Sequence, residues 1–381
     1  MSSTDIPPTK TIFVRKEMIG ASAAPISTRG FFGWVRTRLF GSLFDAILTV
    51  IGLSIAGSII WSVVDFAIVR AVWTGANGEV CRAEGSGACW PYVTAYWQQF
   101  LYGRYPAEER WRAIAVFFAF FGLLVPLAMP KVPFKFANTL AFLVGLPIFA
   151  YVMLCGGWFG LVPVETMRWG GLLVTMVVAV TGIVTSLPIG ILFALGRRSQ
   201  MPIVRMLSVV FIEFWRGVPM ITVLFMAANM LPLFMPDGVD VDKLLRALIG
   251  VSIFTAAYLA ETIRGGLQAI PKGQYEGAMA LGLGYWKMMG LIVMPQALKM
   301  VIPGIVNSFI SLFKDTTLVL IVSIFDLLGM IQSSRSDPEW AAPSTSTTGY
   351  LVAAAIFWIF CFGMSRYSQW MERRLATGHK R

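Results

Sequence analysis

The sequence is poor in the residues that most enzymes use for catalysis and metal binding. Its 381 residues include one histidine, His379, and four cysteines, and no Gly-x-x-x-x-Gly-Lys-Ser/Thr stretch occurs. Without a second histidine or a cysteine cluster we expect no catalytic triad and no metal site. Without the phosphate-binding stretch we expect no ATP hydrolysis of that kind. We therefore predict no catalytic residue and no cofactor bound by the chain itself.

Charged residues are also scarce, at 13% of the chain, whereas 57% of its residues are hydrophobic. Soluble domains are about half apolar, and uninterrupted apolar runs of about 18 residues or more are typical of transmembrane helices. The net charge of +11 predicts no nucleic-acid partner, because membrane proteins collect Lys and Arg in cytoplasmic loops. We predict an all-α integral membrane protein with about eight transmembrane helices. These spans cover residues 43–69, 112–129, 136–158, 168–195, 207–234, 244–263, 292–325 and 349–370, each within a few residues.

The distribution of basic residues predicts that both termini are cytoplasmic. Residues 1–42 contain several Lys, Arg and Pro residues and no short apolar stretch with a cleavage site, so we expect a largely disordered cytoplasmic tail. The short turn between the second and third spans carries Lys131 and Lys135, and short basic loops stay inside. This orientation places residues 70–110 outside and residues 371–381 in a second cytoplasmic tail.

Polar residues within the spans divide the sequence into two parts. Residues 43–165 read as conventional apolar spans with one outside loop. The span at 292–325 contains Pro303 and the Lys314–Thr317 run, and interrupted membrane helices occur where backbone is buried in protein or lines a cavity. We therefore interpret 166–370 as a transport domain and 43–165 as an added set of membrane spans.

The cytoplasmic stretch between the sixth and seventh spans carries a recognisable spacing. Glu276, Ala278 and Gly282 are followed, after nine intervening residues, by Ile292-x-Met294-Pro295. This pattern resembles the Glu-Ala-Ala loop of ABC importer permeases, with Gly277 and Met294 departing from it. The resemblance implies a coupling loop at 264–295 whose short helix docks on a separate ATPase subunit. The implied contact residues are Glu276, Gly277, Ala278, Gly282 and Pro295. The alternative is an ordinary helix-turn-helix loop.

Elementary helix chemistry adds detail to this loop. We expect Gly265-Gly266 to end the preceding helix and Pro271 to begin the next. Tyr275, Met279 and Leu283 are spaced to form one apolar face of a helix. Ala278 and Gly282 are expected to form a flat strip that a partner can approach closely. Glu276 lies in the first turn, where an acid also stabilises the helix dipole without any partner.

Three further stretches resemble the permeases for polar amino acids of the histidine, glutamine, arginine and general L-amino-acid group. They are residues 211–219, 257–266 and 307–318, and with the loop the resemblance spans about half of the chain. Within the second stretch, Glu261 and Arg264 are three apart on one helix face and can form an ion pair. The alternative interpretation is that this ion pair only stabilises the fold.

Charged and hydroxyl residues near the interrupted span are candidates for the substrate pathway. An amino acid carries an ammonium and a carboxylate, so its site needs an acceptor and a donor. The candidates are Lys314, Asp315, Thr316, Thr317, Glu213 and Arg216. The alternative is an internal ion pair of Lys314 or Asp315 with Glu213 or Arg216. In the outside loop, Cys81 and Cys89 flank a glycine-rich turn and are expected to form a disulfide in an oxidising compartment.

The resemblance implies a permease subunit of an ATP-binding-cassette importer for amino acids, located in a bacterial inner membrane. The last five spans would form a type I transmembrane domain. Expected partners are a homologous second permease subunit, two ATPase subunits that use the ATP, a periplasmic amino-acid-binding protein and the lipid bilayer. The alternative is a secondary transporter driven by ions through Lys314, Asp315 and Glu213, and a third possibility is a structural membrane scaffold.

Overall fold

The computed structural model describes residues 30–129, 132–236, 238 and 241–375. The chain divides into two compact units, Met1–Val69 and Arg70–Arg381. Helices are the regular elements of the described ranges, and only isolated β-bridges accompany them. This confirms the predicted all-α class.

The first unit consists of one short and one long helix. α1 spans Gly30–Arg38, so this part of the predicted disordered tail is helical, and residues 1–29 lie outside the described residues. α2 spans Leu43–Val64 and continues as the π-helix η2, Asp65–Val69. Ser42 caps α2, since its hydroxyl accepts the Asp45 amide hydrogen at 3.1 Å. This segment matches the first predicted span.

The second unit contains the remaining spans. Across the described chain, seven helical segments are long and apolar enough to cross a membrane, or eight if one bent pair counts as a span. This agrees with the prediction. The other single spans are α4 (Arg110–Ala128), α5–η5–α6 (Lys135–Leu140, Ala141–Gly145 and Leu146–Cys155), α7 (Gly171–Arg197), α10 (Lys243–Ala269), α13 (Met294–Asp315) and α15 (Pro343–Leu375). α15 includes 371–375 of the second predicted tail, and 376–381 lie outside the described residues.

The predicted span at 207–234 is broken rather than continuous. α8 spans Pro202–Gly217, and a second segment made of α9, η7 and η8 covers Met220–Phe234 at 103° to it. The break lies at Val218-Pro219, where both residues have extended backbone. A residue before proline is disfavoured in the helical region because its backbone meets the proline ring. The Val-Pro pair therefore bends this span.

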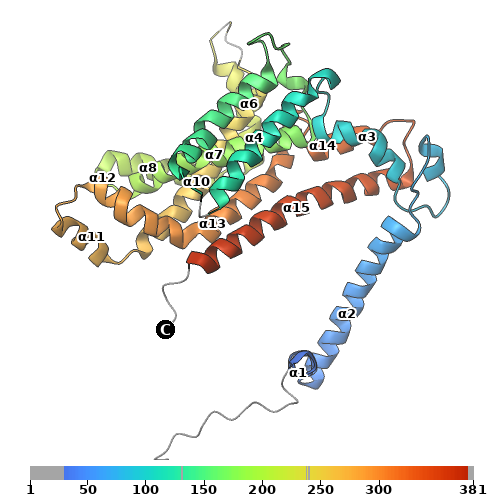
Figure 1. Ribbon diagram of the computed structural model, residues 1–381, viewed down its shortest axis with the longest axis horizontal. Coiled ribbons are helices and arrows are strands. Elements are labelled where there is room, and N and C mark those ends of the chain that lie inside the picture. The colour runs from blue at the N-terminus through green and yellow to red at the C-terminus, as the bar shows by residue number, and fades with distance from the viewer. Residues whose placement is uncertain (1–29, 130–131, 237, 239–240, 376–381) are drawn as a thin grey trace, which may run out of the picture. The chain divides into compact units, whose positions relative to one another are not determined.

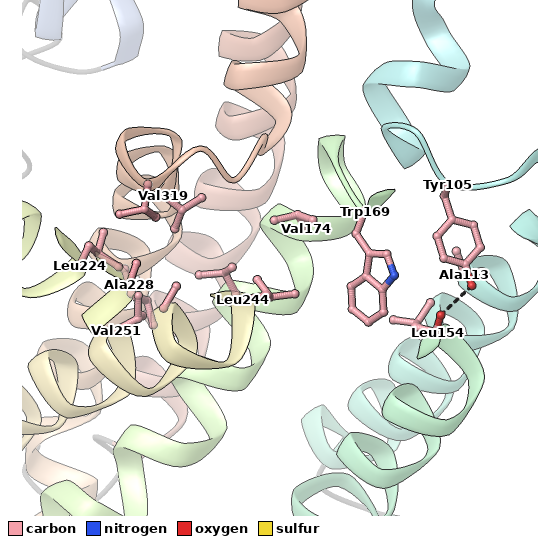
Figure 2. Packing of buried hydrophobic residues seen from close by; sticks show 14 of the residues in the cluster. Tyr105, Ala113, Leu154, Trp169, Val174, Leu224, Ala228, Leu244, Val251 and Val319 are labelled. Atoms are coloured by element: carbon pink, nitrogen blue, oxygen red, sulfur yellow. Dashed lines mark hydrogen bonds between the residues drawn. The ribbon is translucent and has the colours of Figure 1, made fainter. Parts of the chain in front are cut away.

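The core of the second unit is centred on α7 and α10, and close backbone approach holds these helices together. A Cβ atom on Gly190 of α7 would lie 2.9 Å from the Leu259 Cβ atom of α10, so only glycine fits there. One core cluster extends to residues before α7: the Tyr105 hydroxyl donates to the Leu154 carbonyl at 3.0 Å, beside Trp169 (Figure 2). The compact unit thus includes 70–165, which the sequence analysis grouped with the first span.

The predicted outside loop, residues 70–110, is folded more extensively than the sequence predicts. It contains the 3₁₀ helix η3 (Gly78–Cys81) and α3 (Trp90–Tyr102), followed by η4 (Ala107–Glu109). Tyr92 and Phe100 of α3 are fully buried. In the second unit, α3 and α14 (Leu327–Ser334) lie at one end, and α11 (Lys272–Ala280) and α12 (Tyr285–Met288) lie at the other (Figure 1). The apolar residues of α3 explain its burial. Their spacing in the sequence is helical, so this helix could have been predicted.

Candidate functional site

The coupling segment, residues 264–295, begins with an uninterrupted helix. α10 continues through Gly265-Gly266 to Ala269, so the predicted helix end at this pair is wrong. A Cβ atom on Gly266 would lie 2.7 Å from the Ala297 carbonyl oxygen of α13. Gly266 therefore serves close packing of two helices, and it does not terminate one.

A short separate helix follows α10, and its start and end lie where Pro271 and Gly282 predict them. α11 spans Lys272–Ala280 directly after Pro271. Gly282 has a φ of +70°, the Leu283 amide donates to the Ala278 carbonyl at 3.1 Å, and the Gly282 amide donates to the Met279 carbonyl at 2.9 Å. These two bonds form a Schellman motif, which satisfies the last carbonyls of a helix and requires left-handed backbone.

The two faces of α11 are very different. Ala278 is only 2% exposed, and Tyr275 and Leu283 pack against the core cluster that contains Met288 and Val293. The predicted partner strip is therefore wrong at Ala278, because the chain's own helices cover it. Met279 of α11, Leu281 directly after it and Trp286 of α12 are 58%, 77% and 73% exposed, and we call these three residues the outer patch. Glu276, Gly277, Gly282 and Pro295 are exposed as well.

Polar contacts attach α11 to three membrane helices. At the end of α7, the Arg198 guanidinium donates to the Leu267 carbonyl of α10 at 2.5 Å and to the Tyr275 hydroxyl at 3.1 Å. It also lies 5.7 Å from the centre of the Tyr275 ring, a cation–π distance. Gln296 of α13 donates to the Gln274 side chain at 3.0 Å. A displacement of α11 therefore acts directly on α7, α10 and α13.

Sequence reasoning missed Arg198, Gln274 and Gln296 as parts of this site. The signal for Arg198 was its place in a short basic loop, 197–205, which indicated only the membrane side. A glutamine pair 22 residues apart carries no recognisable pattern.

Next to this segment, four charged residues form one network. Arg197 of α7 lies 2.7 Å from Glu213 of α8 and 3.2 Å from Glu261 of α10. Arg264 contacts the same Glu261 carboxylate through two nitrogens, at 2.9 and 2.5 Å. Such two-point contacts fix geometry as well as charge. The expected Glu261–Arg264 pair is thus present, and it belongs to a network that ties α7, α8 and α10 together.

The candidate substrate residues do not meet in one place through polar contacts. α13 ends at Asp315 and continues as the 3₁₀ helix η10, Thr316–Val322. Thr316 is fully buried and donates to the Phe313 carbonyl at 2.8 Å, while Thr317 donates to the Lys314 carbonyl at 2.9 Å. Both hydroxyls therefore satisfy carbonyls at the end of their own helix.

The alternative for Lys314 and Asp315, an ion pair with Glu213 or Arg216, is not formed among the described residues. Glu213 pairs with Arg197, and Arg216 lies over the Tyr258 ring at 5.8 Å. The predicted helix interruption at Pro303 is also wrong, since α13 runs through it. Membrane helices tolerate proline because neighbouring groups satisfy the freed backbone.

At the opposite end, the outside loop is tied to the segment around α14 and α15. A disulfide joins Cys81 and Cys89, and both residues are fully buried. Arg82 donates to the Pro338 and Ala341 carbonyls at 2.8 and 3.0 Å, and the Cys89 amide donates to the Thr348 hydroxyl at 3.0 Å. These contacts join parts of the chain about 260 residues apart.

Two ionisable contacts at this end have shifted pKa values. The Tyr96 hydroxyl donates to the Asp337 carboxylate; burial and this carboxylate raise the pKa of Tyr96, and the hydrogen bond lowers the pKa of Asp337. Asp326 is fully buried and caps α14 by accepting the Gly329 amide hydrogen at 2.9 Å. Burial raises the pKa of Asp326 to about 6.

Residues 186–377 match the sequence model of the binding-protein-dependent transport system inner membrane component family. The chain belongs to this family, in the group of amino-acid ABC transporter permeases. It is 50% identical to the inner membrane amino-acid ABC transporter permease protein YhdY of Escherichia coli K12, over 91% of this chain and 93% of that protein. It is 41% identical to the glutamate/glutamine/aspartate/asparagine transport system permease protein BztC of Rhodobacter capsulatus, over 97% and 99% of the two chains.

Among solved structures, a crystal structure of an amino acid ABC transporter with histidines is 27% identical. The match covers 54% of this chain and 92% of that chain, with a TM-score of 0.47. A structure of the MetNI methionine ABC transporter in an inward-facing conformation is 19% identical. The match covers 52% of this chain and 91% of that chain, with a TM-score of 0.41. The family assignment rests on the sequence relatives, whose likeness spans nearly the whole chain. The chain is therefore a multi-pass inner-membrane permease.

Proposed function

We propose that this permease imports amino acids through a pathway shared with a homologous second permease subunit. Two ATPase subunits supply the energy, a periplasmic binding protein delivers the substrate, and the permease itself binds no ATP or other cofactor. Both termini lie in the cytoplasm, on the side of α11. The observation that carries the proposal is the likeness, along almost the entire chain, to two permeases named for amino-acid transport.

The geometry of α11 supports energy transfer from an ATPase through its exposed face. The outer patch exposes three large apolar side chains to water. Their exposure does not stabilise the chain itself. A partner surface that covers them removes apolar area from water, which stabilises a complex. Arg198 and Gln296 then link α11 to the membrane helices. ATPase closure would reach α7, α10 and α13 through these two contacts.

The test is amino-acid uptake into proteoliposomes that contain the permease with its partner permease, ATPase and binding protein. We expect uptake that requires both ATP and the binding protein. Glutamate, glutamine, aspartate and asparagine are the first substrates to assay, because the Rhodobacter relative is named for them. Uptake by this chain alone, driven by a proton or sodium gradient, would instead favour the ion-coupled alternative and contradict the proposal.

A further inference from the structure

A large apolar cleft lies between the spans that precede α7 and the central helices of the second unit. Its volume is about 1080 Å³, and α4, α6, α7 and α10 contribute to its lining. Representative lining residues are Phe117, Ala150, Val177 and Leu248. The size lies at the upper end of the range for ligand pockets, roughly 300–1,000 Å³. The cleft is also open at the surface, since Phe118 and Met167 of its lining are 68% and 82% exposed.

One polar group inside this cleft has no partner among the described residues. Trp169 lines the cleft and is 7% exposed, yet its indole Nε1–H has no hydrogen-bond acceptor. Figure 2 shows the indole between Val174 on one side and Tyr105 and Leu154 on the other, and the Tyr105 hydroxyl is already engaged with Leu154. Buried indole N–H groups are normally hydrogen-bonded. The wall of the cleft therefore contains a donor whose acceptor the described residues do not supply.

The charged residues of the lining, Glu165 and Asp242, lie just before α7 and α10 begin. Both residues are exposed, as is the neighbouring Arg168. The Thr166 hydroxyl donates to the Asp242 carboxylate, and Asp242 also caps α10 by accepting the Leu245 amide hydrogen at 3.0 Å. These residues lie where α7 and α10 begin, so the polar rim lies at one end of the spans and the apolar lining extends along them.

We propose that this cleft binds one membrane glycerophospholipid with a zwitterionic ammonium headgroup. The acyl chains occupy the apolar lining, which faces the hydrocarbon region of the bilayer. The ammonium lies against the Glu165 and Asp242 carboxylates, whereas an ester or phosphate oxygen accepts from the Trp169 indole, with Arg168 nearby. Both charges of such a headgroup thus find a partner of opposite sign. The lipid fills the space between the added spans and the transport helices, so it joins the two.

The test measures lipid retained by the full-length chain, purified with the subunits that remain bound to it and exchanged into delipidating detergent. Native mass spectrometry after addition of phosphatidylethanolamine or phosphatidylglycerol gives the bound lipid for each. We expect retention of one phosphatidylethanolamine per chain. Ala150→Trp, which fills the cleft, abolishes this retention. Trp169→Phe keeps the ring but removes the N–H, and weakens retention about fivefold, as expected for one hydrogen bond.

Val125→Trp is the matched control for Ala150→Trp. Val125 lies on α4, is 43% exposed and is not part of the cleft lining, so this variant should retain the lipid like the wild type. Size-exclusion chromatography verifies that each variant is folded, and Trp169→Phe keeps the test decisive if Ala150→Trp does not fold. Absence of retained lipid in the wild type, or equal retention by Ala150→Trp, overturns the proposal. Equal retention of phosphatidylglycerol overturns the headgroup assignment.

Discussion

The two ends of the second unit are built in opposite ways. At the end of α3 and α14, a disulfide closes a short loop, and hydrogen bonds from Arg82 and Cys89 fasten this loop to a distant part of the chain. At the end of α11, this nine-residue helix is attached through Arg198 and Gln296, and the outer patch in it and just after it is exposed. One end is cross-linked into a fixed surface, and the other presents a small element that a partner can move.

The largest expected effect comes from the turn that ends α11. Gly282→Asp forces a residue with a Cβ atom into left-handed backbone, which costs about 1–2 kcal/mol, and adds a charge beside the outer patch. Since about 1.4 kcal/mol corresponds to a tenfold change in equilibrium, we expect about a tenfold loss of permease-dependent ATPase stimulation. An ATPase assay with the reconstituted complex measures this.

Gly284→Asp is the control for this variant, because Gly284 is equally exposed but has an ordinary φ of −66° and precedes α12 (Tyr285–Met288). Aspartate is favourable at such a helix-capping position, so stimulation should stay near the wild-type level. Wild-type stimulation by Gly282→Asp would show that this turn has no part in coupling.

Removal of the disulfide should weaken the opposite end without affecting coupling. Cys81→Ser with Cys89→Ser opens a loop with a sequence separation of 8 residues. We expect the free energy of unfolding to fall by about 2–3 kcal/mol. Thermal unfolding in detergent measures the loss, and a reductant should lower the stability of the wild type but not of the variant. Loss of ATPase stimulation in the variant would contradict the division of roles between the two ends.

A smaller effect is expected from pH at the same end. The pKa of Asp326 is raised to about 6 in the folded protein, so the folded state holds this proton more tightly than the unfolded state. The contribution to stability is therefore greatest at low pH and is lost as the pH rises through about 6. We expect the protein to gain about 1–2 kcal/mol between pH 7.5 and pH 5 from this group.

Thermal unfolding of the wild type and of Asp326→Asn across this pH range measures the contribution. Asparagine keeps an oxygen that can accept the Gly329 amide hydrogen, but it does not titrate. The pH-dependent gain should be smaller in this variant by that amount. An identical pH dependence in both proteins would exclude Asp326 as its source.

Local sequence rules predicted the parts of the fold that depend on local chemistry. The apolar runs gave the membrane spans, and Pro271 and Gly282 gave the start and end of α11, because proline and left-handed glycine act through their own backbone. The same rules failed at Gly266, whose role is set by the Ala297 carbonyl of another helix. A glycine that ends a helix and one that admits a neighbour look alike in a sequence.

The candidate site shows the same limit. The spacing from Glu276 to Pro295 predicted a coupling segment, but periodicity could not tell which face of this segment the rest of the chain covers. Ala278 is buried by residues of later helices, and Leu281, outside the predicted apolar face, is the most exposed large residue of the outer patch. Likewise, the partner of Glu213 is Arg197 from α7, a contact that only the packing of α7 against α8 creates.

We expect the outer patch to dock on an ATPase subunit. A photo-crosslinking amino acid at Leu281 tests it most directly in the assembled complex, with Trp97 of α3, 41% exposed at the opposite end, as the reference position. We predict a covalent adduct with the ATPase from position 281 and none from position 97. An ATPase adduct from position 97 with none from position 281 would contradict the account.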